Sequence, residues 1–152
     1  MVLLAPVATN ELAERNECGF RCCVCGEVLP YHPVFCVDHD CPSCGSSVWC
    51  FQRDHSDEVV LEVLPGRTPA LEDIDRLTQT LLQSHDVPHV TVDLSALDIV
   101  NSALVAMLVL LNKRIRAAGG TLQLCELTPV VREIFCRFKL DTLFDIVEHA
   151  WA

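Results

Sequence analysis

The chain has 152 residues, of which 51% are hydrophobic and 21% charged, a balance that suits globular packing and argues against disorder. The formal net charge is −10; residues 1–56 hold seven acids against three bases, and the rest holds fourteen against eight. Because non-specific nucleic-acid binding needs a basic surface, this acidity argues against nucleic acid as a partner. The longest apolar run, residues 103–111, is far shorter than the roughly 20 residues that span a bilayer, so no membrane insertion is expected.

Residues 1–17 are expected to form an N-terminal tail or a short helix. The first seven residues are apolar, but no basic region precedes them and acidic residues follow soon, so they make a poor signal peptide. Ten cysteines would suit a secreted disulfide scaffold, yet their paired spacing favours metal binding in a reducing compartment. We therefore expect a cytoplasmic protein.

Two Cys-x-x-Cys-Gly sequences follow, at 22–26 and 41–45, with fifteen residues between the inner cysteines. Four thiolates at this spacing are typical of a structural zinc ribbon. The glycine that ends each sequence can adopt the positive φ that closes the turn. The segment is below the roughly 40 residues that usually fold on an apolar core alone, so metal binding would supply the missing folding energy. We predict a zinc ribbon over residues 18–53, with zinc held by Cys22, Cys25, Cys41 and Cys44.

The remaining cysteines and histidines of this segment fit the ligand pattern less well. Cys36 and Cys50 lie in short apolar stretches and are expected to be small buried hydrophobic residues, whereas Cys23 should point away from the metal. His32 and His39 lack ribbon spacing and are expected to be surface or structural residues. The pattern assigns no role to Cys18. An iron–sulfur site or a redox dithiol is the weaker alternative, because a thioredoxin-type motif occurs singly beside a βαβ unit.

After the ribbon, expected strands alternate with expected helices. Strands are predicted at 59–64, 89–94 and 121–125, and helices at 71–84, from Asn101 or Ser102 to 118, and from Thr128-Pro129 onward. Residues 143–147 are either a last strand or the start of a final helix. The strand around Trp49 is expected to extend the edge of the same sheet. This alternation predicts an α/β domain with a mostly parallel sheet over residues 54–152.

Two expectations concern burial in this second part. The first turns of the helix that begins near Ser102 are apolar nearly all round, so we expect them to be buried. Cys125 and Cys136 are expected to face the core from a strand and a helix. No Gly-rich phosphate loop, Ser-His-Asp order or pair of carboxylates on one face is visible, so the sequence predicts no enzyme.

The second part resembles the STAS domain, the fold of bacterial anti-sigma factor antagonists. Three stretches carry the resemblance in the family's order: residues 90–95 followed by 101–103, residues 119–125 followed by 128–131, and residues 138–140 with 143–144. The resemblance implies a STAS-like mixed, mostly parallel sheet with helices packed on it. It covers about 95 residues and not the small zinc ribbon, which the cysteine spacing predicts before this fold.

The resemblance also implies a function. In this family a serine after a loop acid is phosphorylated by a partner serine kinase that is also the anti-sigma factor, and that position is Ser102 here. A protein partner would then bind around Asn101, Ser102 and Ala103, and phosphorylation of Ser102 would switch the binding. If Ser102 is not phosphorylated, it is an ordinary helix-capping residue.

The chain departs from the family pattern at the same place. Asn101 replaces the loop acid, Ala103 replaces the second hydroxyl residue, and Leu104 replaces a glycine. These changes move the segment toward STAS subunits that dock on the ATPase of bacterial lipid-trafficking ABC transporters. Nucleic-acid binding through the ribbon, and redox or metal sensing, are further alternatives.

Overall fold

The computed structural model describes residues 21–29, 40–46, 48–55 and 58–148. The expected N-terminal tail lies outside these ranges, as do Cys18, His32, Cys36 and His39. Within the described ranges, no helix is both long enough and apolar enough to cross a membrane.

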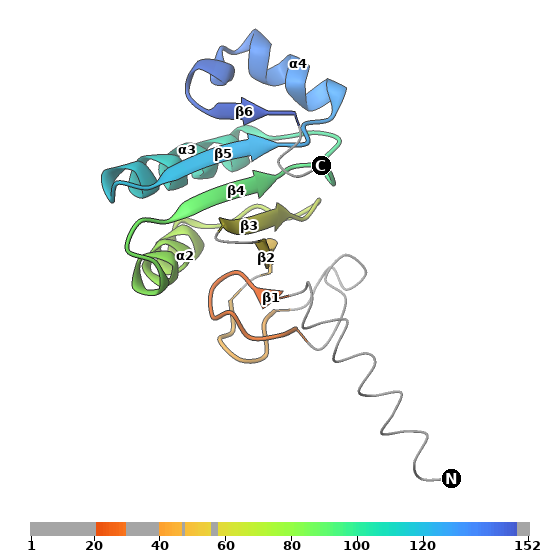
Figure 1. Cartoon of the computed structure of the whole chain (residues 1–152). Coiled ribbons are helices and arrows are strands. Elements are labelled where there is room, and N and C mark those ends of the chain that lie inside the picture. Colours follow the sequence, from red (N-terminus) through yellow and green to blue (C-terminus); the bar gives the residue numbers. More distant parts are fainter. Residues whose placement is uncertain (1–20, 30–39, 47, 56–57, 149–152) are drawn as a thin grey trace.

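A six-stranded sheet forms the centre of the molecule, and its strand order follows the chain from β1 to β6 (Figure 1). β1 pairs antiparallel with β2 and β2 with β3, whereas β3, β4, β5 and β6 run parallel to one another. The predicted mixed, mostly parallel α/β sheet is therefore confirmed. The strands are β1 (Arg21–Cys22), β2 (Cys50–His55), β3 (Glu58–Val63), β4 (His89–Asp93), β5 (Thr121–Cys125) and β6 (Asp145–Val147).

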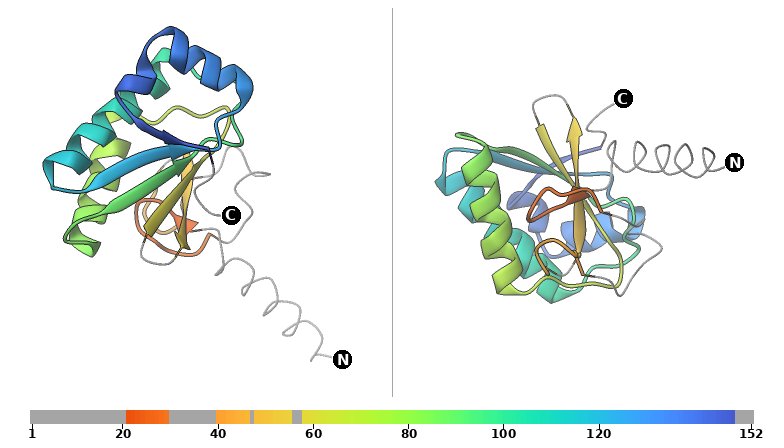
Figure 2. Two further views of the ribbon diagram at one scale, coloured as in Figure 1. Left: turned by 45° about the horizontal axis from the view of Figure 1, so that its top comes forward. Right: turned by 90° about the horizontal axis from the view of Figure 1, so that it is seen from below.

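Three α-helices connect the parallel strands. α2 (Leu71–Ser84) and α3 (Ser102–Ala117) lie side by side on one face of the sheet, and α4 (Pro129–Arg137) lies beside β6 (Figures 1 and 2). A short 3₁₀ helix, η1 (Leu140–Thr142), joins α4 to β6, so residues 143–147 lead into a strand rather than a final helix.

α2 shows how local sequence sets an element. Its buried apolar positions Ile74, Leu77 and Leu81 recur at three- and four-residue spacing, which places them on one face of a helix. Asp73 accepts a hydrogen bond from the Ala70 backbone N–H at 2.8 Å, which satisfies one of the free donors at the helix start. The observed helix has the predicted bounds.

α3 differs from the expectation of burial on all sides. Leu104 and Leu108 are buried, but Ala103 and Ala106 are exposed, and Val105 is only half-buried. The sheet and α2 cover one side of the helix, and no described element fully covers the side toward α4. The expectation of buried first turns was therefore wrong for part of the helix surface.

The two core-facing cysteine predictions have different outcomes. Cys125 on β5 is fully buried, as predicted, whereas Cys136 on α4 is exposed. The buried side of α4 consists of Val131 and Phe135, four residues apart, and Phe135 packs on Phe144 with ring centroids 6.0 Å apart. One residue further along, a helix has turned by about 100°, which carries Cys136 toward solvent.

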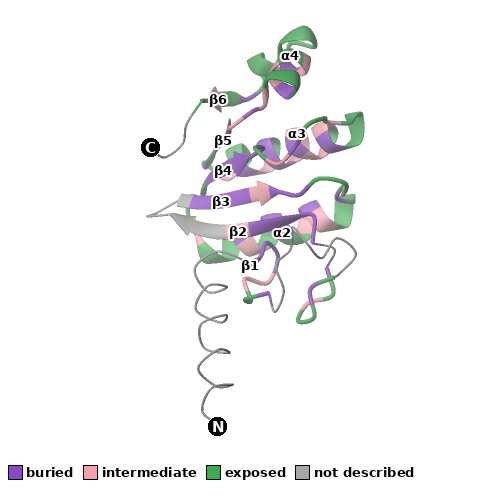
Figure 3. Cartoon of the chain, turned by 90° about the vertical axis from the view of Figure 1, so that its right-hand side faces the viewer, coloured by how far each residue is buried: buried purple, intermediate pink, exposed green. Residues whose placement is uncertain are grey.

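The cysteine-containing segment joins the sheet through β2. β2 pairs with β3 from Cys50 opposite Val63 to the end of the hairpin, and the Leu64 N–H donates to the Trp49 carbonyl at 2.9 Å. The prediction that the strand around Trp49 extends the sheet is confirmed. The boundary predicted between residues 53 and 54 falls inside β2. One cluster of buried residues includes Cys22 of β1, Phe51 of β2 and Leu61 of β3, and Figure 3 shows buried residues in purple on both β2 and β3.

Candidate metal centre and docking face

Four cysteine sulfurs form a cluster near the start of the sheet. The Sγ atoms of Cys22, Cys25, Cys41 and Cys44 all lie within 4.8 Å of one another. Cys22 and Cys44 have sulfurs 3.7 Å apart, and the sulfurs of Cys25 and Cys41 are 3.6 Å apart. Sulfurs about 2.3 Å from a tetrahedral zinc ion would be roughly 3.8 Å from one another, whereas a disulfide needs about 2.05 Å. The cluster therefore fits a metal ion and does not fit disulfides.

Two matching turns bring these sulfurs together. In the first turn, the Gly26 N–H donates to the Cys22 carbonyl at 3.0 Å, and the Cys22 N–H donates to the Glu27 carbonyl at 2.9 Å. The same two bonds recur at the equivalent positions of the second turn, at 2.8 and 2.9 Å. Both turn glycines have a φ of +76°, a conformation that a residue with a Cβ rarely adopts. The repeated sequence thus produces the same turn geometry twice.

The electrostatics of the cluster favour a cation. A hydrogen bond with the Cys23 thiol, together with burial, raises the pKa of Cys22 above its usual value. Burial raises the pKa of Cys25 and of Cys41 as well. Several thiolates cannot share so small a volume without a compensating positive charge. A divalent ion would supply that charge and would displace the protons.

Cys44 has a different environment. Burial raises the pKa of Cys44, but hydrogen bonds from the Ser46 side chain and backbone lower it by more than burial raises it. The resulting pKa is about 7. Ser46 is itself buried and accepts a hydrogen bond from the Arg76 guanidinium of α2 at 2.6 Å. The second turn is thus already arranged for a thiolate, because the Ser46 hydroxyl that lowers the pKa of Cys44 is itself in contact with the positively charged Arg76.

Cys23 and Cys50 are buried outside this cluster. The Cys23 side chain is 1% exposed and that of Cys50 is 0% exposed, and burial raises the pKa of Cys50. Neither sulfur belongs to the group of four within ligand distance. Cys50 is buried as predicted.

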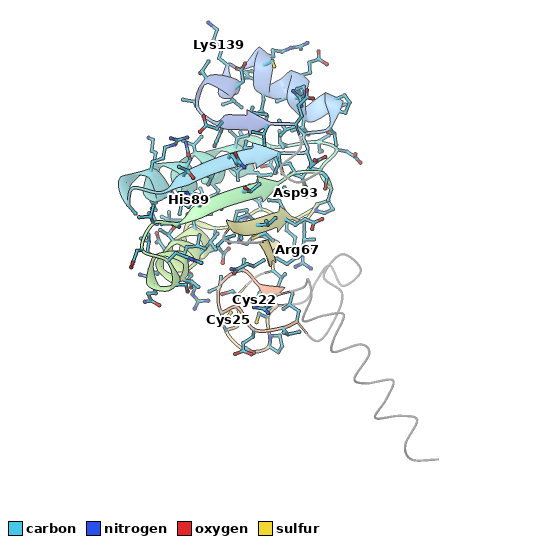
Figure 4. All side chains as sticks on the ribbon, viewed as in Figure 1. Cys22, Cys25, Arg67, His89, Asp93 and Lys139 are labelled. Carbon is cyan, nitrogen blue, oxygen red and sulfur yellow. The ribbon has the colours of Figure 1, made fainter. Side chains whose placement is uncertain are left out.

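Two arginines fasten the second turn to the rest of the fold. Arg76 reaches Ser46 from α2, and Arg67, in the loop between β3 and α2, donates to the Val48 carbonyl. Figure 4 shows Arg67 at the junction between the sheet and the segment that carries Cys22 and Cys25. These contacts could not be predicted from the sequence, because both arginines are distant from the turn along the chain.

The expected partner-binding residues lie together at the start of α3. Asn101, Ser102 and Ala103 are all exposed, and Asn101 is the N-cap of the helix. The Asn101 Oδ1 accepts from the Leu104 N–H at 2.7 Å, while its Nδ2 donates to the Thr68 Oγ1 at 3.2 Å. Because Asn101 provides the cap, the Ser102 hydroxyl is presented on the first helical turn.

An apolar groove lies beside this position, and sequence reasoning missed it. The groove has a volume of about 480 Å³. Ile134 of α4 and Phe138, the residue that caps the end of this helix four positions later, indicate an apolar stripe, and Phe138 is 67% exposed. The groove joins that stripe to the exposed part of α3, and its lining is Val100, Asn101, Ser102, Val105, Ala106, Ile134, Phe138 and Leu140.

Comparison with known proteins identifies the family. Residues 55–148 match the family described as "Mlab, STAS domain", so the chain belongs to the STAS-domain family. The cysteine cluster lies before the matched range. No curated protein matches the chain.

Solved structures agree on the fold. The NMR structure of the protein TM1081 from Thermotoga maritima aligns with a TM-score of 0.54 at 19% sequence identity, over 64% of this chain and 78% of that one. An anti-sigma-factor antagonist (STAS) domain protein from Planctomyces limnophilus aligns with a TM-score of 0.52 at 17% identity, over 66% of this chain and 90% of that one. At these identities, the similarity establishes a shared STAS fold.

Proposed function

We propose that this chain is a cytoplasmic, non-enzymatic regulatory module that binds a protein partner through the start of α3 and the adjoining groove. The proposed partner is an anti-sigma serine kinase, and Ser102 is the residue that it phosphorylates. The observation that carries this proposal is the exposed Ser102 hydroxyl, which lies on the first turn of α3 and lines an apolar groove in a STAS fold.

The surroundings of Ser102 suit a phosphate switch. The first turn of α3 contains no acidic residue, so a phosphate there would meet the positive end of the helix dipole. It would add a charge of about −2 to the rim of the groove. A partner whose apolar side chains occupy the groove would then have to bind beside that charge, so phosphorylation would weaken docking.

We propose zinc as the metal of the cysteine cluster, with Cys22, Cys25, Cys41 and Cys44 as its ligands. Four thiolates complete the tetrahedral coordination of a zinc ion and leave no coordination position open for a substrate. The ion would then have a structural role, and it would hold the two turns of a segment too small to fold on its own core.

A charge substitution tests the docking face. In affinity capture from the native cell, Ser102→Asp is expected to recover less kinase than wild type, and Ser102→Ala is expected to capture it fully. Ser84→Asp is the matched control, because exposed Ser84 ends α2 at the opposite end of β4 from Ser102. Intact-mass measurement should find one phosphate, on Ser102. Equal capture by all variants, with no phosphate under stress or starvation, would reject the proposal.

One observation favours a second candidate, a docking subunit of an ABC-type lipid-trafficking complex. The amide of Asn101 takes the place of the loop carboxylate and is occupied by Leu104 and Thr68, so no carboxylate precedes the serine. Docking would then depend on the groove alone. Capture of a transporter ATPase that is insensitive to Ser102→Asp but lost in Phe138→Ala would support this candidate.

A further inference from the structure

We propose that metal binding at the four cysteines positions the start of α3, through Arg67, Thr68 and Asn101. The regulatory meaning of this link rests on the proposed docking function of that surface, whereas the link itself is a property of the isolated chain. Three steps carry it from the metal cluster to the helix cap.

The first step runs from the metal to the second cysteine turn. Cys41 and Cys44 would supply half of the ligand set. The turn they form is closed by a backbone hydrogen bond from the Cys41 N–H to the Ser46 carbonyl and by another from the Gly45 N–H to the Cys41 carbonyl. Since so small a segment depends on its metal for folding, loss of the ion would release the turn and the residues that follow it, Val48 included.

The second step runs from that turn to the loop between β3 and α2, residues 64–70. Arg67 donates to the Val48 carbonyl and is half-buried at the junction. Arg76 also contacts the turn, at Ser46, but it belongs to a helix that its buried apolar face already holds in place. The middle of the loop has less support, because Pro65, Gly66 and Thr68 are exposed, whereas Leu64 and Pro69 at its two ends are buried. The Arg67 contact is therefore the one that a released turn would disturb.

The third step runs from the loop to α3. Thr68 follows Arg67 directly, and its Oγ1 accepts from the Asn101 Nδ2 at 3.2 Å. The other end of the same planar amide accepts from the Leu104 N–H at 2.7 Å. Because the two ends of an amide turn together, a shift of Thr68 changes the cap bond as well. Arg67 and Thr68 are thus positioning residues for the surface that presents Ser102.

The consequence is a docking face that responds to metal. With the ion bound, the loop holds Asn101 in its capping geometry and Ser102 lies beside the groove. With the ion removed, the loop is released, the cap frays and the serine loses its fixed position. Metal availability would then adjust partner binding without any metal contact to the partner.

Amide hydrogen exchange by NMR on the full chain tests this link without a partner. After zinc is removed with a chelator under reducing conditions, the Leu104 amide should exchange about fivefold faster, the lower end of coupling between distant sites. The amide of Leu124, on β5 in the core, should keep its exchange rate.

Two variants are expected to uncouple the cysteine cluster from the start of α3, and a third serves as a control that keeps the two coupled. Arg67→Met and Thr68→Val should each retain one zinc, show fast Leu104 exchange with zinc bound, and show no further response to chelation. Arg137→Met removes an exposed ion pair with Glu133 on α4, away from the metal site, and should respond to chelation as wild type does.

Three results would overturn the proposal. The first is an unchanged Leu104 rate after chelation. The second is a wild-type response in Arg67→Met and Thr68→Val. The third is faster exchange at Leu124 together with Leu104, which would show general unfolding. None of these results depends on Ser102 capturing a partner, so the failure of the docking proposal would be seen separately.

Discussion

The four candidate ligands differ in how readily they lose a proton. The pKa values of Cys22, Cys25 and Cys41 are raised, by burial for Cys25 and Cys41 and by the Cys23 thiol and burial for Cys22. The pKa of Cys44 is held at about 7 by the hydrogen bonds of Ser46, which outweigh its burial. In the metal-free protein at neutral pH, three thiols are therefore protonated and the fourth is close to half ionised.

This difference predicts a steep pH dependence of zinc affinity. Each protonated ligand must release its proton when the ion binds, so affinity should rise with pH through the neutral range and fall in acid. About three protons should leave per ion near pH 8, where Cys44 is already ionised. Competition with a chromophoric chelator from about pH 6 to pH 8 gives the slope. A flat profile would contradict the assignment of these thiols as ligands.

Single substitutions separate the ligands from the other cysteines. Cys41→Ser should abolish stoichiometric zinc binding, because a serine hydroxyl cannot replace a thiolate in a four-sulfur site. Cys136→Ser is the matched control: its sulfur is exposed and lies outside the cluster, so the protein should still bind one zinc. Elemental analysis of the purified proteins measures both. Zinc retained by Cys41→Ser at the wild-type level would exclude this ligand.

The cap of α3 makes a separate, measurable contribution to stability. Asn101→Ala removes the acceptor of the Leu104 N–H and should lower the free energy of unfolding by about 1 kcal/mol. Asn101→Asp keeps an acceptor at the same position and places a negative charge at the helix start, so it should cost little or nothing. Chemical denaturation compares the two. Equal losses would show that the cap bond contributes no stability.

The elements that sequence predicted well are those that local chemistry defines. The bounds of α2 follow from its apolar spacing, and the start of α4 follows from Thr128 as cap and Pro129 as first residue. The cysteine cluster could also be predicted from the sequence, because two repeated turns with a ribbon spacing leave few possible arrangements for four sulfurs. These features need no knowledge of the tertiary arrangement.

The features that sequence missed depend on how distant elements pack. Cys136 is exposed because α4 packs on the core through Val131 and Phe135. In so short a helix more than one side is apolar, so the sequence does not show which side is buried. The groove beside Ser102 is lined by residues of both α3 and α4, which only the tertiary fold brings to the same place. The contact from Arg67 to Val48 joins residues 19 positions apart, with a whole hairpin between them.

The cysteine segment and the STAS fold share one strand and one core. β2 continues directly from the second cysteine turn, through Trp49, into a six-residue ladder with β3. Neither that ladder nor any of the helices on the sheet contains one of the four candidate ligands. We therefore expect the sheet and helices to persist without metal, and the segment before β2 to open.

Trp49 reports this partial opening. Its side chain is 1% exposed, and its indole Nε1 has no hydrogen-bond partner in the described part of the chain. Removal of zinc should expose the indole to water and shift its fluorescence to longer wavelength, while far-ultraviolet circular dichroism retains the helical signal. Trp49→Phe leaves Trp151 as the remaining tryptophan and should abolish the shift, which assigns it to Trp49. If the helical signal were lost together with the fluorescence change, the metal would be holding the entire fold, and the STAS sheet could not be independent of its cysteine cluster.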